Sequence, residues 1–214
     1  MTEPRSPLGR LRDRLRGSAP AHEREAWRLG SGRAVDVAPE FGTWLNGEPV
    51  PAAVLVGLIE READTSLLLT VRASQLRNHA GQISFPGGRL ETGDVSPEDA
   101  ALREASEEIG LERSDAEVLG FLPDHLVITG YRVTPVIAQL SPDFVWTADE
   151  AEVEQVFELP WSVLDDEARV LSSERRVGPL TLPMREIHFE GHRIWGLTAS
   201  ILLLLRDLGR GGLR

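Results

Sequence analysis

Apolar residues along the chain follow two spacings, one typical of strands and one typical of helices. Apolar runs bounded by charged or turn-forming residues predict strands at 52–59, 66–71, 116–121, 133–140 and 153–159. The charged residues 60–64 between the first two runs predict that they form a hairpin. Two further short runs, 177–182 and 187–189, predict a late hairpin, and the segment 123–132 is interpreted as a loop.

Helical spacing is clearest at 96–110. Ser96 and Pro97 supply an N-cap and a first-turn proline, while Gly110 supplies a C-terminal stop. The apolar face between them is formed by Ala100, Ala101, Leu102 and Ala105. Residues 161–166 predict a helical turn, and 195–208, with six leucines and no proline, predict a C-terminal helix. Strands interleaved with two substantial helices predict an α/β sandwich with a mixed β-sheet.

The N-terminal residues 1–38 predict a basic extension that precedes a single domain at 39–214. Leu11 and Leu15 alternate with arginines here, a pattern that favours a short basic helix. One interpretation is a solvated helix packed on the domain, or a partly disordered tail. The other is a segment that binds a membrane surface or a partner protein.

Candidate chemistry concentrates on the helix predicted at 96–110. Glu104, Glu107 and Glu108 stand at i, i+3 and i+4, so their side chains share one face of that helix. Such carboxylates repel one another, and hard oxygen ligands of this kind bind Mg²⁺ or Mn²⁺. The glycine pair Gly87–Gly88 just upstream lets the backbone approach a ligand. The alternative for the glutamates alone is an ordinary solvated helix face.

Composition narrows the classes of function. The formal net charge of −11 argues against a nucleic-acid binder, although all 23 basic residues are arginine, whose planar fork suits phosphate recognition. No stretch approaches the ~20 apolar residues of a membrane span, and no apolar run of a signal peptide is visible at the N-terminus. The absence of cysteine excludes disulfides, thiol catalysis and cysteine zinc sites. These features fit a cytoplasmic protein.

The segment from Gly88 to Leu111 resembles the Nudix box, commonly written GX5EX7REUXEEXGU with U an aliphatic residue. Residues 103–111, Arg-Glu-Ala-Ser-Glu-Glu-Ile-Gly-Leu, match its second half. The first half departs from it, because Asp94 stands in place of the first glutamate and eight residues rather than seven separate it from Arg103. The resemblance implies a Nudix-like α/β/α sandwich with a mixed sheet.

A second resemblance lies directly upstream of the box. Residues 68–88, LLTVRASQLRNHAGQISFPGG, are similar to the signature that coenzyme A pyrophosphatases of the Nudix superfamily carry before the box, roughly LLTxT(S/A)x3Rx3Gx3FPGG. Arg72 replaces the second threonine and is interpreted as a structural residue. Together the two motifs cover residues 68–111.

These resemblances imply roles for individual residues. Glu104, Glu107 and Glu108 would bind Mg²⁺ or Mn²⁺, with the backbone carbonyl of Gly87 as a further ligand. The alternative for one carboxylate of the cluster is the role of general base. Arg103 would orient the glutamates by ion pairing; its alternative is an ordinary surface salt bridge.

A further acidic residue is expected from outside the box. Glu152 fits the subfamily pattern best among Glu150, Glu152 and Glu154, which would share one face if a strand began there. A solvated acidic loop is the equal alternative for these three residues.

Three residues are candidates for substrate binding. Arg77 falls on the upstream signature and would meet a phosphate of coenzyme A. His79 could contact phosphate too, but a hydrogen-bonded loop histidine is the favoured interpretation. Tyr131, the only tyrosine, could stack on adenine, but a loop-anchoring role is favoured.

The leading hypothesis is a metal-dependent hydrolase that splits coenzyme A (CoA) or acyl-CoA at the pyrophosphate bond. A Nudix pyrophosphatase that acts on ADP-ribose, NADH or another nucleoside diphosphate derivative is the first alternative. A non-catalytic Nudix-fold nucleotide-binding module is the second, disfavoured by the intact Arg-Glu-x-x-Glu-Glu. The expected partner is a small molecule rather than nucleic acid or membrane. Because homodimers are common in the family, a homodimer is also an open expectation.

Overall fold

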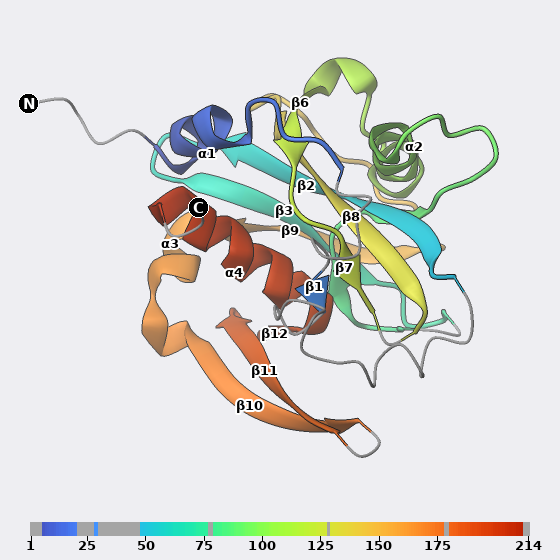
Figure 1. Cartoon of the computed structure of the whole chain (residues 1–214). Helices are drawn as coiled ribbons and strands as arrows, with labels where there is room; N and C mark the ends of the chain where they lie inside the picture. Colours follow the sequence, from blue (N-terminus) through green and yellow to red (C-terminus); the bar gives the residue numbers. More distant parts are fainter. Residues whose placement is uncertain are drawn as a thin grey trace, which may run out of the picture.

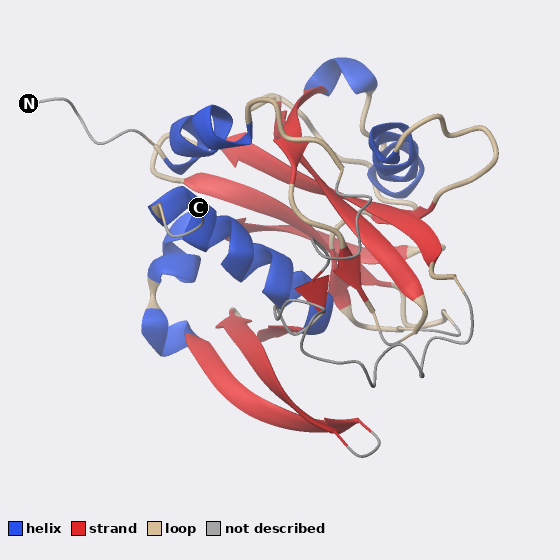
Figure 2. Cartoon of the chain, viewed as in Figure 1, coloured by secondary structure: helices blue, strands red, loops and turns tan. Residues whose placement is uncertain are grey.

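The computed structural model describes residues 6–20, 28–29, 48–76, 79–127, 129–177 and 180–211. A mixed β-sheet lies between helices on both faces, as Figures 1 and 2 show. Buried apolar residues form two clusters, one on each side of this sheet. The prediction of an α/β/α sandwich with a mixed sheet is therefore confirmed.

The centre of the sheet is β2 (Val50–Glu60), which pairs in parallel with β8 (Tyr131–Leu140) and antiparallel with β3 (Thr65–Arg72). The shorter strands extend this core in the described part of the chain. Strands β6 (Ala116–Phe121) and β7 (His125–Leu126) pair with β8, and β1 (Arg28–Leu29) pairs with β7. The others are β4 (Ile83–Ser84) and β9 (Val153–Pro160), which pair with β3, and β5 (Gly87–Arg89), which pairs with β2.

Side chains of the central strands alternate between the two faces of the sheet and so contribute to two separate core clusters. Leu55 and Leu68 belong to the cluster beneath α2 (Pro97–Ile109), whereas Val56, Leu67 and Leu69 belong to the opposite cluster. That second cluster is covered by α1 (Pro7–Leu15) and α4 (Gly196–Arg210). Successive side chains of a strand point to opposite faces, so a continuous apolar run such as that of β2 serves both layers. No helix in the described residues is long and apolar enough to cross a membrane.

The remaining elements are short or lie at the C-terminal end. They are η4 (Arg113–Asp115), α3 (Trp161–Asp165), η5 (Glu167–Arg169), β10 (Val170–Val177), β11 (Leu180–Phe189) and β12 (His192–Trp195). Strands β10, β11 and β12 form a separate antiparallel sheet, and its long β10–β11 pair extends from the body of the molecule (Figure 1).

Most predicted elements are confirmed, but the late hairpin is wrong. Its predicted first strand, 177–182, straddles the connection between β10 and β11, and the strand at 170–176 is missed. The reason is that β10 carries Ser172, Ser173 and Glu174 and exposes much of its length, so it lacks the apolar run by which buried strands are recognised. The expected loop 123–132 likewise contains β7.

The basic N-terminal helix packs on the domain. Leu8, Leu11 and Leu15 are at most 5% exposed and lie in the core cluster with α4. Arg12 pairs with Glu117 of β6, and the hydroxyl of Ser18 accepts a hydrogen bond from the Phe121 amide at 2.9 Å. The predicted boundary at residue 38 lies outside the described residues.

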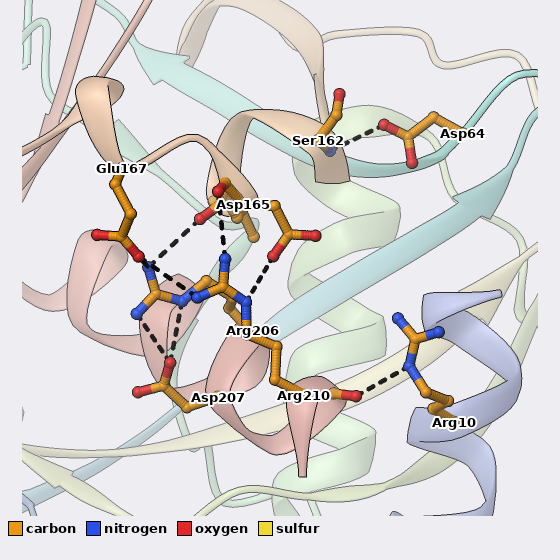
Figure 3. Close-up of polar contacts among 10 residues, drawn as sticks. Arg10, Asp64, Ser162, Asp165, Glu167, Arg206, Asp207 and Arg210 are labelled. Atoms are coloured by element: carbon orange, nitrogen blue, oxygen red, sulfur yellow. Dashed lines mark hydrogen bonds and ion pairs between the residues drawn. The ribbon is translucent and has the colours of Figure 1, made fainter. Parts of the chain in front are cut away.

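Arginines join the three helices at this end of the molecule (Figure 3). Arg206 of α4 is 7% exposed and donates to the carbonyl of Leu164 and to Asp207. One turn later Arg210 binds Asp165 of α3 at 2.8 Å. Arg10 of α1 donates to the carbonyl of Gly209 near the end of α4. Helix α1 is therefore held by polar contacts as well as by its leucines.

We expect that Leu11→Ala lowers the free energy of unfolding by about 2–5 kcal/mol, because it leaves a cavity at a fully buried position. Arg16→Ala, at an exposed position next to the same helix, should change it by less than about 0.5 kcal/mol. Urea unfolding followed by circular dichroism measures both. Equal, small effects would show that α1 contributes nothing to the core.

Candidate active site

Helix α2 is bounded as its sequence dictates. The Ser96 hydroxyl accepts a hydrogen bond from the Asp99 amide at 3.1 Å and donates to the Asp99 carboxylate at 2.8 Å. Gly110 ends the helix with φ +69°, a left-handed conformation that costs glycine little. These caps determine the register of the helix and thereby which glutamates face the sheet.

The glycine pair on β5 lets this helix approach the backbone closely. A Cβ atom on Gly88 would lie 2.3 Å from Glu104 Oε1, and one on Gly87 would lie 2.4 Å from the carbonyl oxygen of Ala53. Gly87 also has φ +154°. A side chain at Gly87 would push the strand away from the backbone of β2, and one at Gly88 would displace the Glu104 carboxylate.

Arg103 connects the loop before α2 to the glutamates. Its Nε and one terminal nitrogen donate to both oxygens of Asp94 at 3.1 and 3.0 Å, and the same terminal nitrogen donates to the carbonyl of Arg89. Its other terminal nitrogen donates to Glu104 and Glu107, each at 3.0 Å. The hydrogen bond from Arg103 lowers the pKa of Asp94. This partly buried set of five hydrogen bonds differs from the isolated surface salt bridge considered as the alternative for Arg103.

The three glutamates of the cluster differ in burial. Glu108 is 3% exposed, Glu104 is half-buried, and the Glu107 side chain is 60% exposed. Burial raises the pKa of Glu104, and Arg103 opposes that shift. Burial likewise raises the pKa of Glu108 to about 8; Arg72 opposes this shift, and the charges of Glu104 and Glu152 add to it. A solvated helix face does not describe Glu104 and Glu108.

Glu152 reaches the site from a turn rather than from a strand. Its carbonyl accepts from the Ala73 amide at 2.8 Å, and its amide donates to the carbonyl of Asp149. Asp149 in turn donates to the carbonyl of Glu108 at 3.0 Å, which anchors this turn to the end of α2. The charge of Glu152 contributes to the raised pKa of both Glu104 and Glu108. Sequence pattern alone left this placement open.

A divalent cation fits this corner chemically. Glu108 Oε2 is buried without a hydrogen-bond partner in the described part of the chain, and the nearby donors are hard carboxylate oxygens. The backbone of Gly87 hydrogen-bonds the same carboxylate. Glu107, however, lies on Arg103, and among the described residues no three acidic or histidine side chains converge closely enough to hold a metal. Metal binding therefore requires side-chain rotation, above all by Glu107.

The structure describes two of the three residues predicted to bind substrate. Arg77 lies outside the described residues. His79 is exposed, has φ +60° and hydrogen-bonds Gln82 Oε1 at 2.9 Å, as a loop histidine would. Tyr131 begins β8, and its hydroxyl accepts a hydrogen bond from Arg89, whose guanidinium also lies 5.1 Å from the ring centroid.

Sequence reasoning missed two residues here. Arg89 follows Gly88 directly and approaches Tyr131, so its position after the glycine pair was the available signal. Arg72, interpreted from the sequence as a structural residue, has its guanidinium 3.8 Å from Glu108 Oε1. The sequence feature that distinguishes Arg72 is its place in the upstream signature, where the pattern has a threonine.

The chain is similar to one group of proteins over most of its length. The NUDIX domain profile matches residues 49–178. An uncharacterized Nudix hydrolase NudL of Citrobacter koseri is 41% identical over 171 residues, which cover 74% of this chain and 83% of the relative. NudL of Escherichia coli (strain K12 / DH10B) is 42% identical over 158 residues, which cover 71% and 78%. The crystal structure of a MutT protein from Methanosarcina mazei has a TM-score of 0.50 at 16% identity and covers 79% of this chain and 99% of that chain, a likeness of fold alone.

We expect Glu108→Gln to stabilise the metal-free protein at alkaline pH. Between the ordinary pKa of 4.5 and the folded value of about 8, the folded state keeps a proton that the unfolded state releases, so stability falls as pH rises through this window. Glu108→Gln has no group that titrates at this position, so its stability should not fall in this window. Its free energy of unfolding should exceed that of the wild type by roughly 2–4 kcal/mol at pH ~8.5, and this difference should become smaller towards pH ~5.5.

Thermal melts in EDTA measure this difference. Adding Mn²⁺ should then stabilise the wild type and not the variant, since a ligand stabilises only the state that binds it. A gain that does not change with pH would show that burial does not perturb Glu108.

Proposed function

The chain belongs to the Nudix hydrolase family and is a hydrolase of pyrophosphate bonds; on this premise, we propose that its substrate is coenzyme A or an acyl-CoA. The products would be 3′,5′-ADP and 4′-phosphopantetheine or its acyl derivative. The observation that carries the choice of substrate is the upstream signature, residues 68–88, whose described residues border the carboxylate corner.

Backbone contacts support this reading of the signature. Its residues run from β3 through a loop to β4 and β5, and the loop returns to Arg72, because the Gly81 amide donates to the Arg72 carbonyl at 2.9 Å. Ala73 binds the turn that carries Glu152. Phe85 is 3% exposed in the core and anchors the segment before Gly87. The described part of the signature therefore lies beside the glutamates, which supports the proposal that it contributes to the same site.

The proposed reaction requires cations and an activated water. Water attacks one phosphorus of the pyrophosphate, the bond from that phosphorus to the bridging oxygen breaks, and the other phosphate leaves. Glu104, Glu107 and Glu108, with the Gly87 carbonyl, would hold Mg²⁺ or Mn²⁺. A bound divalent ion supplies Lewis-acid stabilisation of the phosphates and a more acidic water.

The chain's own groups divide the remaining work. Arg103 orients Glu104 through a 3.0 Å hydrogen bond, while Asp94 restrains Arg103; Glu107 would leave Arg103 to reach the ion. One carboxylate of the cluster, with Glu152 among the candidates, accepts the proton of the attacking water. The Glu152 carboxylate is exposed on a turn and is not hydrogen-bonded to Arg103, which leaves it available for that role.

Substrate groups outside the pyrophosphate would meet the rim of the site. Tyr131 offers an aromatic face beside Arg89, a combination that suits an adenine ring and a phosphate. Arg77 and His79 would approach the 3′-phosphate of CoA from the loop of the signature. The expected setting is the cytoplasm, as a monomer or a homodimer.

Incubation with Mg²⁺ or Mn²⁺ and a panel of CoA, acyl-CoA, ADP-ribose, NADH and deoxynucleoside triphosphates tests the substrate. We expect CoA species to be cleaved with the highest kcat/KM, with 3′,5′-ADP detected by chromatography. Faster turnover of ADP-ribose than of CoA would overturn the substrate assignment. No cleavage of any compound would favour a nucleotide-binding module.

The matched control for this assay compares two glutamates of α2. Glu108→Gln should reduce kcat by at least about 10³-fold, since it removes a buried ligand of the proposed ion. Glu98→Gln, in the first turn of the same helix, should retain activity within about twofold, because Glu98 pairs only with Arg113 at 2.9 Å among its described ion pairs.

Asp94→Asn tests whether the displaced acidic residue of the box keeps its role. Loss of the charge that restrains Arg103 should weaken Mn²⁺ binding and lower kcat by about 10–100-fold, the effect typical of residues that orient metal ligands. Glu91→Gln, at an exposed position of the same loop, should have little effect. Unchanged kcat and Mn²⁺ affinity in Asp94→Asn would mean that Arg103 is positioned without Asp94.

A further inference from the structure

Arg72 lies at the end of β3, where the strand leaves the sheet. Its amide donates to the carbonyl of Gln82 at 3.0 Å, and its carbonyl accepts from Gly81 at 2.9 Å. The pairing of β3 with β9 changes register between Val71 and Arg72. The backbone is thus held on both sides, and the irregular register sets the side chain beside the carboxylate corner.

The Arg72 side chain contributes charge to the site without hydrogen bonds to it. One terminal nitrogen lies 3.8 Å from Glu108 Oε1, beyond hydrogen-bonding distance, and the side chain is 27% exposed. Its Nε is buried with no hydrogen-bond partner in the described part of the chain, as is Glu108 Oε2. The two groups therefore face each other, and each has unused hydrogen-bonding capacity.

The second arginine of the site is held differently. Arg103 donates five hydrogen bonds to oxygens of Asp94, Arg89, Glu104 and Glu107. Its position is therefore fixed by several contacts at once. Arg72 makes a single charge contact through the same kind of group. An ion held only by charge is readily exchanged for a cation of higher charge that can approach more closely.

We propose that Arg72 is a positioning residue that occupies the place of a cation at Glu108 and is displaced from it when a divalent metal binds. The inference rests on the proposed metal site and goes beyond it. Glu108 also faces the carboxylates of Glu104 and Glu152 and the backbone of Gly87, so Arg72 is the one cationic side chain among the described groups that influence it. Arg72 thus places a positive charge beside Glu108 while the site is metal-free and competes with the incoming ion.

Mn²⁺ binding to the metal-free protein, without substrate, tests the exchange. Free Mn²⁺ is measured by electron paramagnetic resonance for the wild type and for Arg72→Thr, Arg72→Lys and Arg113→Thr. We expect Arg72→Thr to lower the Kd for Mn²⁺ by about tenfold. Arg72→Lys, which keeps the charge, should stay within about threefold of the wild type. Arg113→Thr removes an arginine paired with the first turn of α2 and should also change little.

The sign of the effect separates the proposal from a purely structural role. If Arg72 only supports the loop, its loss loosens the site and Mn²⁺ binds more weakly; weaker or unchanged binding in Arg72→Thr overturns the proposal. Glu108→Gln shows which idea has failed. If Glu108→Gln abolishes Mn²⁺ binding while Arg72→Thr leaves it unchanged, only the exchange is wrong. If the wild type binds no Mn²⁺, or if Glu108→Gln binds it as well as the wild type, both the proposed metal site and the displacement of Arg72 are wrong.

Discussion

The close approach of α2 to the backbone of β5 is the constraint on which the site depends. The Glu104 carboxylate occupies the space that a Cβ atom on Gly88 would fill, and the fully buried alanines of α2 let the helix lie flat on the sheet. This contact carries the Glu108 carboxylate into the interior, at the end of the helix where the dipole favours cations and the last turn contains no basic residue. Burial and helix polarity therefore both disfavour the charged form of Glu108, and a bound cation would offset both.

The second requirement is that loop and helix move as one unit. Arg103 binds the loop through Asp94 and the Arg89 carbonyl and binds the helix through its glutamates, so a shift of the loop would displace the carboxylates. The departure at Asp94 is informative for this reason. A shorter acid with one additional residue of chain still reaches both Nε and a terminal nitrogen of Arg103, so the contact is kept although the spacing has changed.

Sequence alone predicted what local chemistry determines. The caps at Ser96 and Gly110 gave the bounds of α2, and the buried strands followed from their apolar runs. It did not predict β10, which is too polar to resemble a buried strand, or the turn that carries Glu152, whose place depends on hydrogen bonds to Ala73 and to the end of α2. The approach of Arg72 to Glu108 depends on a register shift between β3 and β9, and no local pattern encodes such a long-range pairing.

The charges of this corner explain why a phosphate-bearing substrate would need added cations. Five acidic side chains border this corner, those of Asp94, Glu104, Glu107, Glu108 and Glu152, and they outnumber its two arginines, Arg72 and Arg103. The whole chain likewise has a formal net charge of −11. All the guanidinium donors of Arg103 are directed at protein oxygens, so that residue has no capacity left for phosphate. A pyrophosphate would thus be repelled by the bare site, and its binding must be coupled to the entry of divalent ions.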